Sequence, residues 1–120
     1  MPAAGGAVRA AKKAGGRVQR VPGHHPVLDV LARRLGALPS VRRVILFGSR
    51  ARGDHDQRAD IDLAVDCPAA SREDWGRIWN AVDDAPTLLK VDLVRLDEAG
   101  DEFRAEIERE GIVLYDHGKG

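Results

Sequence analysis

The sequence has a single cysteine, no long apolar run and few aromatic residues. Cys67 is the one cysteine in 120 residues, so an internal disulfide is impossible, and we expect a buried thiol in a reduced, cytoplasmic setting. No run of about 18 apolar residues is present, and the N-terminus lacks the apolar middle region of a secretory signal. These absences argue against a disulfide scaffold, a membrane-spanning protein and a secreted protein.

Charge is balanced in total but uneven along the chain. Residues 1–53 hold eleven Lys or Arg against one acidic residue, Asp29, whereas residues 54–120 hold eight basic and eighteen acidic residues. Such a dipole could attract a polyphosphate or an acidic partner, although a solvated basic tail beside an ordinary acidic surface explains it as well. A nucleic-acid-binding surface is a third interpretation. Because interleaved aromatic residues and a recognisable reading helix are missing, nucleic acid is disfavoured as a partner.

Length and composition predict one folded domain after a basic extension. Residues 1–23 are mostly Ala, Gly and basic residues with hardly any large apolar side chains, too few to offset the entropy of ordering, so we expect a disordered arm. Residues 24–120 have the length of one domain and enough apolar residues for a modest core. We find no repeat and no second domain in the pattern.

Apolar spacing predicts an alternation of helices and strands. Pro26 suits the first turn of a helix whose apolar residues recur at helical spacing up to Leu38. Ser71 and Asp74 are spaced as a capping box that begins a second helix, and a further helix stops at Gly111. The expected strands cover residues 44–47, 60–65, 91–96 and 112–115. This order predicts the α/β (α+β) fold class, with one mixed sheet backed by helices.

The segment Phe47–Gly53 has the composition of an anion-binding turn. A strand ends at Gly48, whose missing side chain lets a ligand approach the backbone, and the Ser49 hydroxyl offers a donor to a phosphate oxygen. Arg50 and Arg52 are candidate counter-charges. Taken alone, the same pattern also occurs in ordinary surface turns.

Asp60 and Asp62 strengthen the functional interpretation of that turn. Their spacing of two puts both carboxylates, together with Ala64, on one face of a strand whose other face is core. Two neighbouring anions on a half-buried face repel each other, and a divalent cation relieves the repulsion. Asp92 lies in another apolar strand, where a charge is costly. If the two strands are neighbours, the three carboxylates converge.

Three carboxylates beside a phosphate-binding turn suit two-metal phosphoryl or nucleotidyl transfer, in which the ions activate the nucleophile and hold the leaving oxygens. Mg²⁺ is the expected ion, because it prefers carboxylate and phosphate oxygens and keeps several waters. Zinc is disfavoured, because Cys67 and the scattered histidines form no ligand pattern.

With these residues identified, the sequence resembles the nucleotidyltransferases of the DNA polymerase beta superfamily, whose signature is Gly-Ser, ten residues and Asp-x-Asp. Here Gly48 and Ser49 are followed by residues 50–59 and then by Asp60 and Asp62. Asp92 stands where the family has its third carboxylate. The end of the chain is similar to that of the minimal members, the antitoxin halves of HEPN/MNT toxin-antitoxin pairs.

The resemblance, which extends over about residues 26–116, implies a polymerase beta-like fold and a role for each motif residue. Gly48 and Ser49 would hold the triphosphate. Asp60 and Asp62 would bind two Mg²⁺ ions, and Asp92 would complete the ion that activates the acceptor hydroxyl. In the antitoxin relatives the acceptor is a tyrosine of a HEPN ribonuclease toxin, which becomes adenylylated as pyrophosphate leaves. The C-terminal domain of larger members is missing, which disfavours aminoglycoside- or tRNA-directed activity.

The expected function is therefore that of a Mg-dependent protein adenylyltransferase that uses ATP. It would act as the antitoxin of a HEPN-type ribonuclease toxin and form a hetero-oligomer with it. The alternative is a non-catalytic, nucleotide-binding antitoxin that neutralises the partner by binding alone. A transferase with a small-molecule or nucleic-acid acceptor is a further reading of the same motif.

Overall fold

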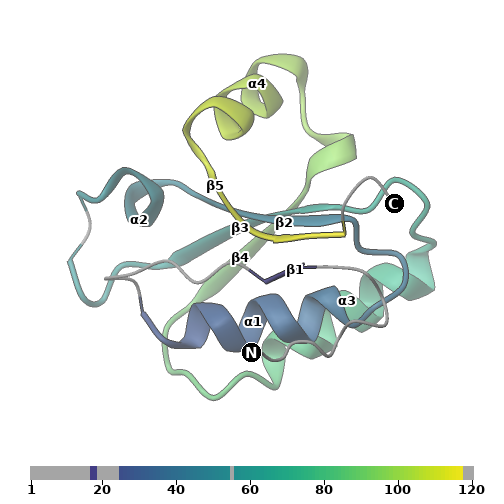
Figure 1. The fold of residues 1–120 in the computed structure, drawn as a ribbon, viewed down its shortest axis with the longest axis horizontal. Coiled ribbons are helices and arrows are strands. Elements are labelled where there is room, and N and C mark those ends of the chain that lie inside the picture. The colour runs from purple at the N-terminus through teal and green to yellow at the C-terminus, as the bar shows by residue number, and fades with distance from the viewer. Residues whose placement is uncertain (1–16, 19–24, 55, 118–120) are drawn as a thin grey trace.

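In the computed structural model of the protein, the described residues are 17–18, 25–54 and 56–117. They form a five-stranded mixed sheet with helices against it (Figure 1). The elements in chain order are β1 (Arg17–Val18), α1 (Val27–Gly36), β2 (Arg43–Phe47), α2 (Ser49–Arg52), β3 (Ile61–Asp66), α3 (Arg72–Asp83), β4 (Val91–Arg95), the 3₁₀ helix η2 (Leu96–Glu98), α4 (Asp101–Glu110) and β5 (Ile112–Asp116).

The sheet has the strand order β1-β5-β2-β3-β4. β2 pairs antiparallel with both β3 and β5, whereas β3 and β4 run parallel. The parallel pair is possible because α3 connects the two strands across one face of the sheet. This arrangement confirms the predicted fold class of one mixed sheet backed by helices.

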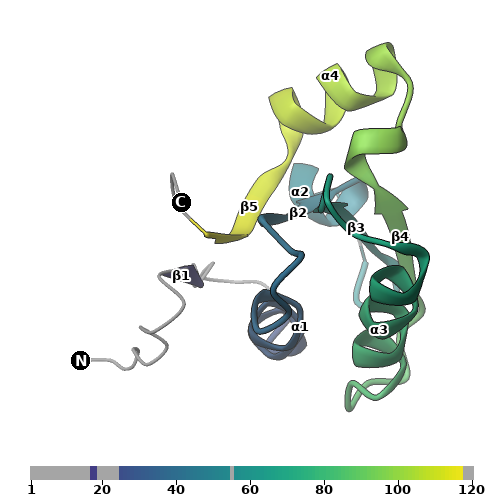
Figure 2. The ribbon, with the colours of Figure 1, turned by 90° about the vertical axis from the view of Figure 1, so that its right-hand side faces the viewer.

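One face of the sheet is covered by α1 and α3, which lie on the same side of it (Figure 2). The predicted helix after Pro26 is confirmed as α1, with Pro26 at its N-cap, and it buries Leu31 and Leu35 completely. The predicted capping box is also confirmed, since Ser71 and Asp74 each accept a hydrogen bond from the other's backbone N–H. Strand residues that point to this face complete the main core: Val44, Leu46, Ile61, Leu63 and Val65.

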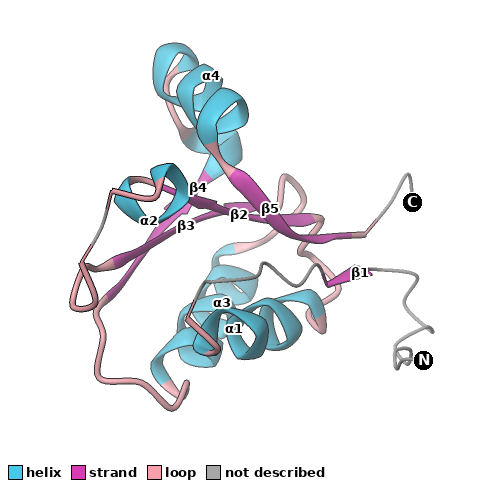
Figure 3. Cartoon of the chain, turned by 60° about the vertical axis from the view of Figure 1, so that its left-hand side comes forward, coloured by secondary structure: helices cyan, strands magenta, loops and turns pink. Residues whose placement is uncertain are grey.

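The opposite face is covered in part by α4 and η2. Ile45, Leu96 and Ile107 pack there with Ala64, all nearly inaccessible to solvent. Figure 3 shows that α4 and the short α2 lie on this side, opposite α1 and α3. Ala64 shares the face of Asp62, as its spacing predicts, but Ala64 itself is fully buried. The cause is α4, whose Ile107 covers the far half of the face and leaves the other half for the acidic residues.

Two expectations concern the basic N-terminal arm and the possibility of a membrane-spanning helix. Arg17 and Val18 belong to the segment expected to be a disordered arm, yet they form β1, paired antiparallel with Asp116 and Tyr115 of β5. The other residues of that arm lie outside the described part of the chain. Within the described residues, no helix is long and apolar enough to span a bilayer.

Candidate active site

Two of the three carboxylates lie side by side on neighbouring strands, and together with Asp60 they form what we call the carboxylate row. In the register of the sheet, Phe47 of β2 stands opposite Asp62 of β3, and Asp62 stands beside Asp92 of β4. Residues paired in this way share a face, and neighbouring strands are about 4.8 Å apart. The sequence left open whether the strands of Asp62 and Asp92 are neighbours, and the structure places them side by side.

Asp60 completes the group from outside the strand. It precedes β3, which begins at Ile61, and its side chain is exposed to solvent. The backbone N–H of Ile61 donates to the Lys90 carbonyl at 2.9 Å, which starts the pairing of β3 with β4 directly after Asp60. Asp60 therefore stands at the edge of the sheet, with β3 on one side and the preceding segment on the other.

The negative charges of Asp92 and Asp60 act electrostatically on Asp62. The pKa of Asp62 is raised above its usual value, chiefly because partial burial disfavours the charged form and then because the charges of Asp92 and Asp60 repel it. Arg52 and Lys90 oppose this rise. Lys90 also forms a loose ion pair with Asp92, with Nζ 3.7 Å from Oδ1. The site thus holds an excess of negative charge that a bound cation would relieve.

Gly48 brings a backbone turn directly against this group. Its φ of 75° and ψ of −154° are readily reached only by glycine. A β-carbon at position 48 would collide with Oδ2 of Asp62. The Gly48 carbonyl accepts hydrogen bonds from the N–H groups of Ala51 and Arg52, both at 3.1 Å. The N–H groups of Ser49 and Arg50 precede this first bonded turn of α2, as donors at the start of a helix do.

The two arginines of the turn differ in position. Arg50 is only 3% exposed, and its guanidinium donates from Nε to the Ala59 carbonyl at 3.1 Å and from Nη2 to the Gln57 carbonyl at 3.0 Å. This placement differs from the predicted one as a phosphate counter-charge, because the group faces the protein interior. Arg52 is exposed and forms an ion pair with Asp54 (Nε to Oδ2, 3.2 Å), so its charge remains at the surface beside the site.

Sequence reasoning missed an aromatic pair next to the carboxylate row. The rings of Phe47 and Phe103 meet edge to face, with centroids 5.6 Å apart and an interplanar angle of 80°. Phe103 is 41% exposed. Phe47 could have been noticed because it directly precedes Gly48, but nothing in the sequence brings α4 to that point. Lys90, two residues before Asp92, was missed in the same way.

The donor set fits a magnesium ion that takes most of its ligands from elsewhere. Among the described residues, no group of three or more His, Cys, Asp or Glu side chains is arranged to hold a metal ion by itself. Mg²⁺, however, is commonly bound through one or two carboxylates together with substrate phosphates and waters. The mutual repulsion at Asp62 is consistent with such a partial site, built from Asp60, Asp62 and Asp92.

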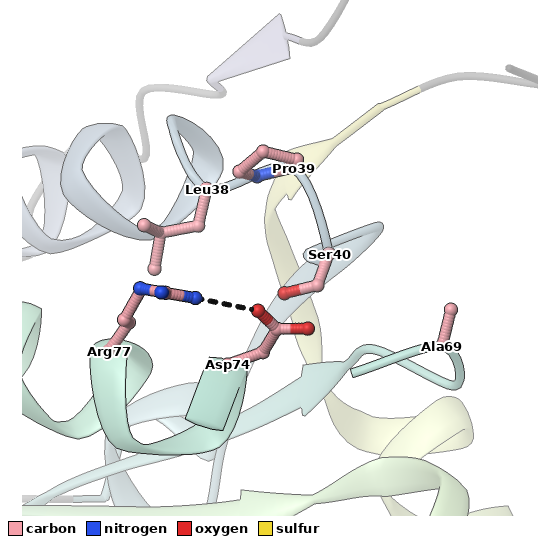
Figure 4. A pocket seen from close by; sticks show the side chains of 6 residues that line it. All are labelled: Leu38, Pro39, Ser40, Ala69, Asp74 and Arg77. Atoms are coloured by element: carbon pink, nitrogen blue, oxygen red, sulfur yellow. Dashed lines mark hydrogen bonds and ion pairs between the residues drawn. The ribbon is translucent and has the colours of Figure 1, made fainter. Parts of the chain in front are cut away.

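A separate open hollow lies away from these residues. It has a volume of about 470 Å³ and is lined by six residues between the end of α1 and the start of α3, shown in Figure 4. Its two charged side chains are already engaged with each other and with α3, since Asp74 caps α3 and also accepts a hydrogen bond from Arg77 at 3.0 Å. We therefore place the chemistry at the carboxylate row, where Asp62 is repelled by Asp92 and Asp60 in spite of the nearby Arg52 and Lys90.

A carboxylate row beside a glycine turn, on one face of a mixed sheet, is an arrangement that suits the transfer of phosphoryl or nucleotidyl groups. The chain belongs to the polymerase beta nucleotidyltransferase family, because the family model described as "Polymerase beta, Nucleotidyltransferase" matches residues 31–119. Among curated proteins, none matches the sequence significantly.

Two solved structures have a similar fold. One is a toxin-antitoxin with AMP-PNP, at 25% identity and a TM-score of 0.55, covering 72% of this chain and 71% of that chain. The other is a mutant of the toxin-antitoxin MntA-HpeT, at 22% identity and a TM-score of 0.54, covering 72% and 70%. The second likeness bears on the fold alone. Both agree with the predicted fold of a minimal nucleotidyltransferase.

Proposed function

We propose that this protein is a Mg-dependent nucleotidyltransferase that transfers AMP from ATP to a partner protein. The observation that carries the proposal is the pairing of Asp62 with Asp92 on parallel strands, in contact with the turn at Gly48. Family membership supports nucleotidyl transfer as the reaction class. The likeness to a toxin-antitoxin with AMP-PNP supports an adenine nucleotide as the donor.

Each site residue has a distinct part in this proposal. Gly48 and Ser49 bind the triphosphate through backbone N–H groups and the Ser49 hydroxyl. Asp60 and Asp62 hold the magnesium ions, with Asp92 as a third ligand. When bound, the metal supplies neutralisation of the phosphate charge and activation of the acceptor hydroxyl. Asp92 is 43% exposed at its side chain, so an acceptor can approach it from solvent.

The bonds exchanged follow from this arrangement. The acceptor oxygen forms a bond to the α-phosphorus, and the bond from that phosphorus to the bridging oxygen breaks. Pyrophosphate leaves with the bridging oxygen, and the acceptor proton passes to solvent or to a site carboxylate. Arg52, exposed next to Asp62, balances part of the negative charge that gathers there.

The proposed acceptor is a toxin protein, of the HEPN ribonuclease type, which this chain would silence as an antitoxin in a cytoplasmic complex. The likeness to a toxin-antitoxin structure at 25% identity supports such a partner. The HEPN type rests on the resemblance of the motif and of the chain's ending to the minimal nucleotidyltransferases. Neutralisation by binding alone remains the rival that the experiment must separate from catalysis.

The test uses purified protein, Mg²⁺ and ATP labelled at the α-phosphate, added to a lysate of the source cell. Wild type should label a protein band by AMP, and ATP labelled at the γ-phosphate should leave that band unlabelled. The double variant Asp60→Asn/Asp62→Asn should give no label. A matched control, Asp83→Asn/Asp84→Asn, removes two exposed carboxylates at the end of α3 and should label normally.

The results separate the two functions. Labelling by wild type and control, but not by the site variant, establishes nucleotidyl transfer and reveals the acceptor by its mass. If wild type and site variant neutralise the partner toxin equally and neither transfers any label, the protein acts by binding alone and the proposed catalysis is refuted. A label in RNA or in a small molecule instead of protein would refute the proposed acceptor.

A further inference from the structure

Arg50 is the most buried charged side chain in the described residues, and its partners are unusual for a charge. Both of its hydrogen bonds go to backbone carbonyls, those of Gln57 and Ala59. Within the described part of the chain it has no carboxylate partner. Because Arg50 is only 3% exposed, its guanidinium needs such bonds, since burying a charge without them is costly.

The two carbonyls belong to the segment that leads into Asp60. This segment forms a small turn in which Asp56 accepts twice, from the Arg58 N–H at its side chain (2.8 Å) and from the Ala59 N–H at its carbonyl (3.2 Å). Ala59 immediately precedes Asp60. Arg50 therefore joins the turn before Asp60 to α2, the helix that begins at Ser49.

Asp60 depends on this connection more than Asp62 does. Asp62 sits inside β3, where pairing with both β2 and β4 sets its direction. Asp60 lies ahead of the strand and is exposed, so the sheet restrains it only from the side of Ile61, whose N–H donates to the Lys90 carbonyl. The hydrogen bond from Arg50 to the neighbouring Ala59 carbonyl is the closest tertiary restraint on Asp60 from the side of the turn.

We infer that Arg50 is a positioning residue, which sets the carboxylate of Asp60 relative to Ser49 and Asp62 so that one metal-nucleotide complex can contact all three. Arg50 does not itself contact the nucleotide, because its guanidinium is buried against the loop. This inference rests on the proposed function, since it concerns the binding of a metal nucleotide at that site.

Arg50→Lys distinguishes positioning from a simple effect of positive charge. Lysine keeps the charge but lacks the planar fork that donates from Nε and Nη2 to two carbonyls at once. If Arg50 acts only by the attraction of its positive charge for the phosphates, the lysine variant retains its affinity for the metal nucleotide. If the fork holds the loop, the lysine variant loses affinity as the alanine variant does.

Arg95→Lys is the matched control. Arg95 also donates to two loop carbonyls, from Nη2 to Cys67 at 3.2 Å and to Ala70 at 2.9 Å. It lies at the end of β4 opposite to Asp92, so its loss should affect stability without moving a site carboxylate. Both variants remove guanidinium bonds to two loop carbonyls, and Arg95→Lys removes in addition the Nε bonds to Asp97, so it is the more severe change to the fold.

The measurement is the affinity of purified protein for Mn²⁺ with a non-hydrolysable ATP analogue, followed by calorimetry and by the electron spin resonance of free Mn²⁺. For Arg50→Lys we expect affinity to fall roughly tenfold to hundredfold, as when a group supporting a metal ligand is removed. Arg95→Lys should bind as wild type does. Guanidinium ion, at concentrations too low to denature, should restore part of the affinity of Arg50→Ala.

Amide exchange tests the same inference without a nucleotide. The Arg58 and Ala59 amides should be protected in the wild type and exchange faster in Arg50→Lys, while Arg95→Lys leaves them unchanged. If Arg50→Lys does not fold, the wild type alone decides, because exchange of these two amides at the rate of an unfolded peptide would overturn the inference.

The possible failures are distinguishable. A wild type that binds the metal nucleotide, with an Arg50→Lys variant of equal affinity, overturns the positioning role alone. A wild type that does not bind the metal nucleotide at all overturns the proposed function, and the positioning role with it.

Discussion

Gly48 and Asp62 are in direct contact: the position that a β-carbon would take at residue 48 is already occupied by Oδ2 of Asp62. The contact joins the end of β2 to the start of β3, two strands that pair antiparallel at this point. It means that the glycine of the turn is required twice, once for its backbone angles and once for the space beside the carboxylate.

Gly48→Ala should therefore damage both fold and site. The left-handed backbone alone costs about 1–3 kcal/mol for a residue with a side chain, and the collision must also displace Asp62. We expect a lower thermal midpoint and a loss of metal-nucleotide binding, measured by calorimetric unfolding and titration.

Gly53→Ala is the control for backbone strain without collision. Gly53 has a φ of 85°, and no atom lies within 4 Å of its missing β-carbon. This variant should lose about 1–2 kcal/mol of stability from strain but keep its affinity for the metal nucleotide. Equal binding losses in the two glycine variants would contradict the role given to the contact with Asp62.

Asp62→Asn should stabilise the protein in the absence of metal. The raised pKa of Asp62 means that its charge is unfavourable in the folded state, because of burial and of repulsion by Asp92 and Asp60. Removing the charge should raise the free energy of unfolding at neutral pH by up to about 1 kcal/mol for this partly exposed site. Mg²⁺ and nucleotide should then raise the thermal midpoint of the wild type but not of the variant.

Asp84→Asn provides the comparison for that experiment. Asp84 is an exposed residue at the C-cap of α3, away from the row of carboxylates. Mg²⁺ and nucleotide should raise the thermal midpoint of this variant as much as that of the wild type. A stabilising response in Asp62→Asn equal to that of the wild type would show that the ligand binds elsewhere.

Glu108 should make the stability of the protein depend on pH. Arg43 donates to both of its carboxylate oxygens, at 3.0 and 2.8 Å, and to Asp66 at 3.0 Å, which links α4 to β2 and β3. The hydrogen bonds from Arg43 lower the pKa of Glu108, against the opposing effect of burial. The stabilisation is thus fully present above the unfolded pKa of about 4.5 and is lost as pH falls through the lower folded pKa.

Glu108→Gln should lower the free energy of unfolding by about 0.5–1 kcal/mol at neutral pH, since the pair is partly exposed and screened. The difference from wild type should narrow in acid, once Glu108 of the wild type is protonated. Denaturant unfolding across a pH series measures this difference in the free energy of unfolding. Glu106→Gln, on the exposed side of α4, is the control. A difference that is independent of pH would argue against the ion pair as its source.

Cys67 should be unreactive in the folded protein. Its thiol is completely buried, donates to the Val65 carbonyl at 3.8 Å, and has its pKa raised to about 11, mainly by burial. Because only the thiolate reacts readily, dithionitrobenzoate should label no thiol in native protein at mildly alkaline pH and one thiol per chain in denaturant. Rapid labelling of the native state would show that the segment after β3 opens.

The local sequence accounts for most elements of the fold. The spacing of Leu31 and Leu35 predicts α1, the Ser71 and Asp74 pair predicts the start of α3, and alternation from Asp60 predicts β3. Each of these signals acts within a few residues, because helix and strand periods are short. The spacing between Gly48 and Asp60 is equally local, which is why the motif could be found before the structure.

Other features depend on contacts between distant residues. The register that sets Asp62 beside Asp92 follows from the parallel pairing of two strands that α3 separates in the chain. The burial of Ala64 follows from α4, and the edge-to-face contact of Phe103 with Phe47 has the same origin. Periodicity says which face of a strand is apolar, but not which neighbour will cover it.

Arg50 shows most clearly the difference between what local sequence determines and what tertiary contacts determine. The sequence alone determined that an arginine follows Ser49 in a glycine-flanked turn, and a free cation beside a phosphate site was the natural interpretation. Only the tertiary structure decided that its guanidinium turns inward to the carbonyls of Gln57 and Ala59. The physical reason is that the direction of a long side chain depends on which unpaired polar groups the folded chain places within its reach, and that is settled when the loop closes.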